Sequence, residues 1–124
     1  MKNYLTKTDG IKTINKMLNK EIRDFYTYNK LVRKLLDIKT NIPIYINKKM
    51  VLLPTKSYKS YDCVWLNYYA IKDIISNDNR LSIMFKNGEV MFIKISINRL
   101  NRIINNALKI IEYFRNLEFE NVIN

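Results

Sequence analysis

The sequence has no histidine, one cysteine, Cys63, and only two glycines in 124 residues. A histidine base, a Cys–His pair, a zinc quartet and an internal disulfide are therefore excluded. Two separated glycines cannot form a glycine-rich phosphate loop. The carboxylates Asp62, Asp73 and Asp78 are scattered, and we interpret them as solvated surface groups. We expect a protein that is not an enzyme, with no catalytic residue, cofactor or metal.

Long apolar runs are missing as well. No run approaches the roughly 18 to 20 apolar residues that span a bilayer, and the start lacks the apolar run of a secretion signal. Few prolines and glycines leave little room for linkers, so residues 1–124 are predicted to form one domain. Residues 1–8 are expected to be a mobile end, and residues 117–124 to fray or to pack onto the basic body. The expected compartment is a reducing cytoplasm.

Positive charge is what the sequence has in excess. It holds 22 Lys and Arg against 11 Asp and Glu, a formal net charge of +11. Abundant Ile, Lys, Asn and Tyr indicate an AT-rich genome, but that bias favours Asp and Glu codons too and does not explain the excess of cations. The balance predicts a polyanionic partner, with nucleic acid ahead of an acidic membrane surface or an acidic protein.

Two helices are predicted in the first third of the chain. Apolar residues at helical spacing predict one over residues 9–23, with Asp9 as its N-cap. A second apolar stripe crosses residues 30–38 and ends near residues 40–41, because Pro43 disfavours helix in the residue before it. The stripe consists of Leu31, Val32, Leu35, Leu36 and Ile38, and the cations Lys30, Arg33 and Lys34 project from the opposite side. These cations either contact phosphate or are simply solvated.

A third, long helix is predicted from Asn98 to about Asn116, where apolar residues keep a 3.6-residue period over about five turns. Ser96 or Asn98 can cap its first turn. Arg99 and Arg102 lie outside its apolar stripe. The stripe consists of Leu100, Ile103, Ile104, Ala107, Leu108, Ile111 and Phe114.

Short apolar runs predict the strands. Residues 43–46 and 50–53 are predicted to form a hairpin, and Pro54 ends its second strand because it cannot donate to the ladder. The chain then leaves the sheet in a loop rich in lysine, hydroxyl and tyrosine groups, and residues 63–67 return as a strand. Trp65 is expected to anchor the core, since burying an indole removes about 150–250 Å² of surface from water.

An Asn-Gly pair marks the clearest hairpin, between residues 81–85 and 90–96. A two-residue turn would set Phe85 opposite Val90, whereas a three-residue loop with Gly88 left-handed sets Ile83 opposite Met91 and Leu81 opposite Ile93. We prefer the second register because residues 91, 93 and 95 then share one apolar face. We expect a helix or a second subunit to cover the other face, which carries Met84, Val90 and Phe92.

The loop between the strands at 50–53 and 63–67 is the candidate contact with a polyanion. Its lysines and hydroxyls, with the lysines of the preceding hairpin turn, can bind phosphate and sugar oxygens. Contacts to about five phosphates would make log K fall with log salt at a slope of about −4.5. The alternative is that Tyr58 and Tyr61 only pack the loop. The candidate DNA-contact residues are Lys30, Arg33, Lys34, Lys48, Lys49, Lys56, Ser57, Lys59, Arg99 and Arg102. Such a set suits the narrow minor groove of AT-rich DNA.

Four motifs follow one another in register: Leu53-Pro54-Thr55-Lys56-Ser57, Cys63-Val64-Trp65, Phe85-Lys86-Asn87-Gly88 and Ile95-Ser96. Their order and spacing resemble the ComK family of bacterial competence transcription factors, over roughly residues 26–114. Leu53 stands where that family has an aromatic residue before the proline. The resemblance implies a DNA-binding transcriptional activator of low-GC Gram-positive bacteria that acts on AT-rich boxes through the minor groove and self-associates on its promoter sites.

These patterns predict an α+β fold: a small antiparallel sheet of about five or six strands, an N-terminal helical segment and a long C-terminal helix packed on the sheet. The expected function is that of a ComK-like transcription factor that binds double-stranded DNA as a homodimer or higher assembly, without a membrane. A second hypothesis is an interaction protein of a phage or mobile element that inhibits a host nucleic-acid machine by binding a host protein.

Overall fold

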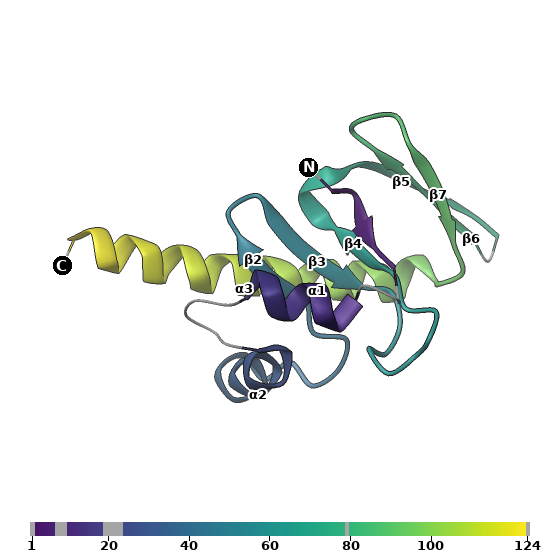
Figure 1. Ribbon diagram of the computed structural model, residues 1–124. Coiled ribbons are helices and arrows are strands. Elements are labelled where there is room, and N and C mark those ends of the chain that lie inside the picture. Colours follow the sequence, from purple (N-terminus) through teal and green to yellow (C-terminus); the bar gives the residue numbers. More distant parts are fainter. Residues whose placement is uncertain (1, 7–9, 19–23, 79, 124) are drawn as a thin grey trace.

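The computed structural model describes residues 2–6, 10–18, 24–78 and 80–123. They form an α+β fold with a long C-terminal helix against a sheet, which confirms the predicted class (Figure 1). The described strands belong to two antiparallel sheets of four and three strands, where we expected one sheet. The elements are β1 (Tyr4–Leu5), α1 (Gly10–Met17), α2 (Phe25–Leu36), β2 (Ile44–Asn47), β3 (Met50–Pro54), β4 (Trp65–Asn67), the 3-10 helix η1 (Tyr68–Ala70), β5 (Ile71–Asn77), β6 (Arg80–Phe85), β7 (Val90–Ile93) and α3 (Ile97–Ile123).

The four-stranded sheet has the order β1-β4-β3-β2. Its edge strand β1 pairs with β4 and lies within the end that we expected to be mobile. Asn67 holds the same end, because its N–H donates to the Asn3 carbonyl at 2.7 Å and its side-chain amide donates to the Lys2 carbonyl at 2.9 Å. Leu5 is buried in the core. A two-residue strand has no periodicity of its own, so only its distant partner identifies it.

The hairpin predicted over residues 43–53 is confirmed as β2 and β3, and β3 ends at Pro54. Strand β4 then carries Trp65 into the core. The Trp65 side chain is 2% exposed and meets the Phe25 ring edge to face, with 5.7 Å between ring centroids. The expectation that Trp65 anchors the core is therefore confirmed.

The three-stranded sheet has the order β5-β6-β7, and its second hairpin follows the preferred register, with Leu81 opposite Ile93 and Ile83 opposite Met91. Gly88 makes this turn possible because its φ is +92°, in the left-handed region that other residues rarely adopt. Of the two covers expected for the outer face, a covering helix is not found among the described elements. Val90 and Phe92 are 46% and 66% exposed, and no described helix lies over them. Cover by a second subunit stays a prediction.

The N-terminal helices differ from the predicted ones. Helix α1 covers only part of the predicted range 9–23, and Asp9 and residues 19–23 lie outside the described residues. Helix α2 begins at Phe25, ahead of the predicted stripe. Asp24 caps it: the carboxylate accepts from the Thr27 N–H at 2.8 Å, which holds the pKa of Asp24 below its usual value. The helix ends at Asp37, whose φ is +55°.

The buried face of α2 is Phe25, Tyr28, Asn29 and Val32. The predicted stripe was wrong in two members, because Leu31 and Leu35 are 37% and 47% exposed. Aromatic residues upstream of the leucines fix the rotation of the helix. The Tyr28 hydroxyl, fully buried, donates to the Pro43 carbonyl at 2.8 Å and accepts from the Tyr45 N–H at 2.9 Å.

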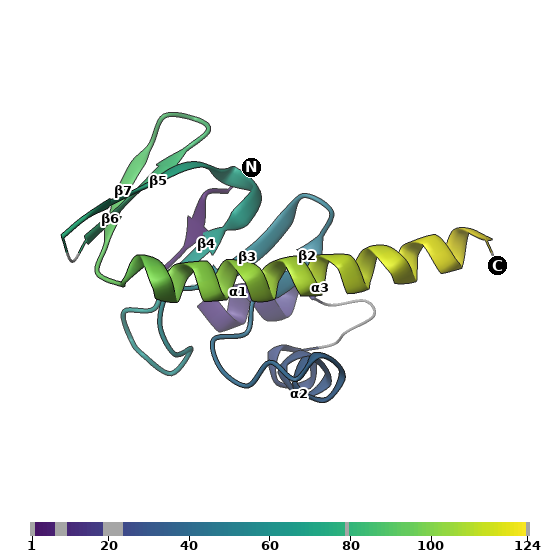
Figure 2. The same cartoon turned by 180° about the vertical axis from the view of Figure 1, so that it is seen from behind.

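Helix α3 begins after Ser96, whose hydroxyl oxygen accepts from the Arg99 N–H at 3.1 Å, and it continues beyond the predicted end at Asn116. It runs along the back of the four-stranded sheet (Figure 2). Phe114 stacks on Tyr45, with 4.5 Å between centroids, and links the helix to β2. Leu108 of the predicted stripe is exposed, and Ile110 is buried in its place. None of the helices in the described ranges is both long and apolar enough to span a bilayer.

Candidate nucleic-acid interface

The loop between β3 and β4 is fixed at its base by one pair of residues. Thr55 donates to the Val64 carbonyl through both its N–H, at 3.0 Å, and its hydroxyl, at 2.9 Å. The Val64 N–H donates back to the Thr55 hydroxyl oxygen at 3.1 Å. Three hydrogen bonds therefore close the loop where it leaves the sheet.

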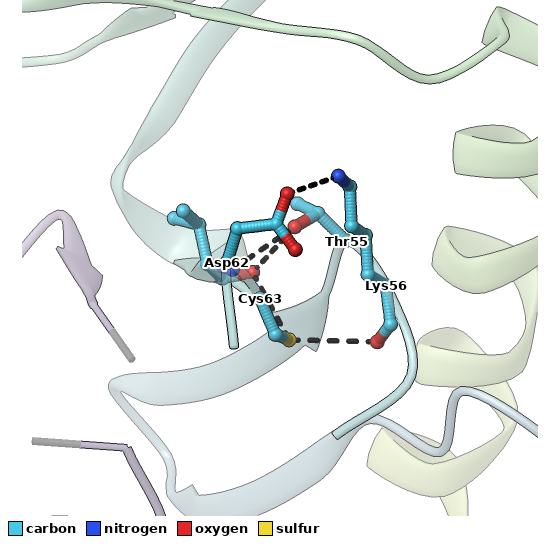
Figure 3. A network of polar contacts seen from close by, with 5 residues as sticks. Thr55, Lys56, Asp62 and Cys63 are labelled. Carbon is cyan, nitrogen blue, oxygen red and sulfur yellow. Dashed lines mark hydrogen bonds and ion pairs between the residues drawn. The ribbon is translucent and has the colours of Figure 1, made fainter. Parts of the chain in front are cut away.

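Further contacts join the two ends of the loop (Figure 3). The Cys63 thiol donates to the Lys56 carbonyl at 3.4 Å and is only 2% exposed. Burial raises the pKa of the Cys63 thiol, so this cysteine is a packing group without thiolate character. The Lys56 ammonium pairs with the Asp62 carboxylate, and the two side chains are 38% and 47% exposed. Asp62 therefore offsets part of the Lys56 charge offered to a phosphate.

Aromatic contacts bring this loop against α2. The Tyr58 ring meets Phe25 at 4.9 Å and Tyr26 at 6.1 Å between centroids, both edge to face. Tyr58 thus packs the loop, as the alternative interpretation held, whereas the side chain of Tyr61 is 73% exposed. The Lys59 ammonium lies 5.9 Å from the Tyr58 centroid, in cation–π range. The contacts made by Tyr58 determine where the loop presents its cations.

The structure therefore brings two of the predicted groups together. On α2, Lys30, Arg33 and Lys34 are all exposed, and their i, i+3 and i+4 spacing puts them on one helix face. Arg33 and Ser57 line the same cavity, so this face adjoins the loop. We define the α2–loop surface as Lys30, Arg33, Lys34, Lys56, Ser57 and Lys59.

The other candidates lie elsewhere. Lys48 and Lys49 belong to the turn before β3, whereas Lys56 follows β3, so a five-residue strand separates them. At about 3.4 Å per residue that is roughly 17 Å. Lys48 instead shares a second cavity with Arg115, a residue outside the predicted set. Only the fold could identify Arg115, because it depends on the Phe114 contact with β2. The last two candidates, Arg99 and Arg102, lie at the start of α3.

Within the described ranges, no group of three or more His, Cys, Asp or Glu side chains converges in a way that could hold a metal ion. The chemistry of the α2–loop surface is that of cations, hydroxyls and tyrosine rings on a fixed scaffold. Groups of these kinds can bind phosphate oxygens.

A family model described as ComK protein matches residues 1–117 of the chain. The chain belongs to the ComK family. That family is one of competence-type, DNA-binding transcription factors. The match extends beyond residues 26–114, which carried the resemblance, and includes β1 and α1. No curated protein and no solved structure matched the sequence.

Proposed function

We propose that this ComK-family protein binds AT-rich double-stranded DNA through the minor groove and regulates competence-type genes. The observation that carries the proposal is the α2–loop surface. Its members Lys30, Arg33, Lys34 and Lys59 have no carboxylate partner among the described residues, so their charges are available to phosphates. With a net charge of +11, the whole molecule attracts a polyanion to this surface.

Arg33 is the arginine of this surface and the candidate for the minor groove. AT-rich sequence narrows that groove and concentrates its negative potential, which favours inserted arginine. The lysines on either side suit the flanking phosphates, because an ammonium supplies affinity without sequence information. This division of roles predicts a preference for AT-rich duplexes over a strong background of general binding.

A gel-shift series with AT-rich and GC-rich duplexes at several salt concentrations tests the proposal. We expect tighter binding to the AT-rich duplex, steep weakening with salt, and displacement by a minor-groove ligand. Failure to shift any duplex at low salt would overturn it. That result would favour the second hypothesis, an inhibitor that acts on a host protein.

We also propose that a second copy of the chain covers the outer face of the three-stranded sheet. Ile75, Val90 and Phe92 are 43%, 46% and 66% exposed, and the strand pairing places them around Ser82 and Met84. Exposed apolar side chains that gather on one face of a sheet favour contact with a partner.

Charge on this face favours a second copy as the occupant. Asp73 lies opposite Met84, and Met84 lies opposite Val90 on the next strand. Arg80, opposite Asn77, lies at the other end of the same sheet face. A two-fold axis that runs across the strands places Asp73 of each copy beside Arg80 of the other. The face measures about 240 Å², against roughly 800 Å² per partner in a stable dimer. We therefore expect a weak dimer that DNA strengthens by raising the local concentration.

Sedimentation at increasing protein concentration, with and without a two-site duplex, measures this association. Phe92→Lys should abolish it. Asp73→Arg and Arg80→Asp should each weaken it, whereas the double variant should restore it because the charges are exchanged. A double variant no better than either single change would contradict the proposed axis.

A further inference from the structure

We propose that the cavity between α2 and the β3–β4 loop binds a small carboxylate with a planar apolar body. The cavity has a volume of about 140 Å³, and residues from α2, from the segment before β2 and from the loop line it. Arg33 and Ser57 belong both to this lining and to the α2–loop surface, but the proposed DNA binding does not require the cavity itself. Its lining combines two features: polar groups of largely buried residues that have no partner in the described part of the chain, and three aromatic side chains.

Two buried polar side chains line the cavity without a hydrogen-bond partner in the described part of the chain. Asn29 is 9% exposed and Trp65 is 2% exposed. Neither the Asn29 carboxamide nor the Trp65 indole N–H bonds to a described residue. Yet the described residues contain no fully buried side-chain nitrogen or oxygen that lacks a partner. Both groups therefore reach accessible space, and the cavity is the space that both of them line.

Several hydrogen-bond donors line this cavity. The Trp65 indole can only donate, and the Arg33 guanidinium, which has no partner among the described residues, offers five N–H groups. The Ser57 oxygen accepts from the Lys59 N–H at 3.3 Å, which leaves its O–H free to donate. A ligand that matches these groups must accept several hydrogen bonds and carry negative charge. A planar carboxylate meets the guanidinium fork in a bidentate pair.

The rest of the ligand must be apolar and small. Phe25 and Tyr58, in edge-to-face contact at 4.9 Å, line the cavity together with Trp65 and Ile42. The volume is roughly ten times what one water molecule requires, which admits a ligand of about ten non-hydrogen atoms. Inorganic phosphate would satisfy the donors but leave the aromatic side chains uncovered. An aromatic carboxylate satisfies both.

Occupancy would also change the proposed DNA interface, a consequence that rests on the proposed function. A carboxylate paired with Arg33 removes that cation from the DNA. The ligand should therefore weaken binding to an AT-rich duplex and lower the salt slope by about 0.9, the value for one phosphate contact.

The binding itself is tested without DNA, so its failure would leave the proposed function untouched. Trp65 is the only tryptophan, and its indole N–H gives one resonance in a ¹⁵N-correlated spectrum. We expect benzoate to shift this resonance saturably. Benzamide, which has the same shape without the charge, and inorganic phosphate should each bind at least about tenfold more weakly, because each lacks half of the required chemistry.

Two variants of α2 provide the matched comparison. Arg33→Gln should weaken benzoate binding about tenfold, because it removes the charge-assisted pair. Lys30→Gln removes the same charge from the same helix face, but Lys30 does not line the cavity, so binding should change less than about twofold. The absence of saturation, an equal loss in both variants, or a phosphate affinity equal to that of benzoate would overturn the proposal.

Discussion

Neutralising the basic face of α2 should remove most of the salt dependence of DNA binding. The change is Lys30→Gln, Arg33→Gln and Lys34→Gln in one variant. Each phosphate that a cation neutralises contributes about −0.9 to the slope of log K against log salt. The α2–loop surface offers five cations, and five contacts give a slope of about −4.5. The variant keeps Lys56 and Lys59, so its slope should be about −1.8.

Fluorescence anisotropy with a labelled AT-rich duplex measures this difference directly. Between 50 and 200 mM salt, a slope of −4.5 weakens binding about 500-fold, whereas a slope of −1.8 weakens it only about 12-fold. Glutamine keeps a high helix propensity, and all three side chains are exposed. The free energy of unfolding should therefore change by less than about 0.5 kcal/mol per site.

The matched control removes three charges from the other end of β3. Lys48→Gln, Lys49→Gln and Arg115→Gln change the net charge by the same amount, and they belong to the β2–β3 turn and the second cavity. We expect this variant to keep a slope close to −4.5. Equal slopes in the two variants would refute a localised contact at α2. A shallow slope in the control alone would move the interface to the β2–β3 turn.

Three further predictions concern stability and are measured by chemical denaturation. Trp65→Ala should cost about 3–5 kcal/mol, because it removes a buried ring from the core; a loss under about 1 kcal/mol would show that Trp65 is not the anchor. Tyr28→Phe leaves the Tyr45 N–H without its acceptor and the Pro43 carbonyl without its donor, so we expect a loss of about 1–3 kcal/mol. Gly88→Ala should cost about 1–2 kcal/mol from the left-handed backbone alone, since an added Cβ meets no atom within 4 Å. An unchanged midpoint for either variant would contradict its stated cause.

Local patterns identified the parts of the fold that local chemistry determines. The register of β6 and β7 follows from one left-handed glycine and from alternating apolar residues, both visible within a few positions. Strand β1 is different, because its partners lie about 60 positions away. The rotation of α2 likewise depends on Phe25 and Tyr28, which pack on the distant residues Trp65 and Tyr45. The helical spacing of apolar residues shows which of them share a face. It does not show which face packs against aromatic residues that are distant in sequence.

The candidate site likewise has features that the local sequence predicts and features that depend on distant contacts. Composition was enough to select the lysines of α2 and of the loop as candidates. Composition could not show that Lys48 and Lys49 lie far from Lys56. These lysines are close in sequence, but they lie at opposite ends of β3. Composition also could not predict the ion pair between Lys56 and Asp62, or that Asn29 and Trp65 line the same cavity. Each of these relations depends on where the β3–β4 loop folds back.

The contacts that stabilise the β3–β4 loop also fix the position from which it would bind a ligand. Thr55 and Val64 close its base, and Tyr58 packs it against Phe25 of α2, so its position is set before any ligand arrives. A loop ordered in advance avoids the conformational entropy that a mobile lysine-rich segment loses on binding. The packing role of Tyr58 and the proposed binding role of its neighbours are therefore not alternatives. Because Tyr58 contacts Phe25 and lines the same cavity as Arg33, the loop and the basic face of α2 are held together.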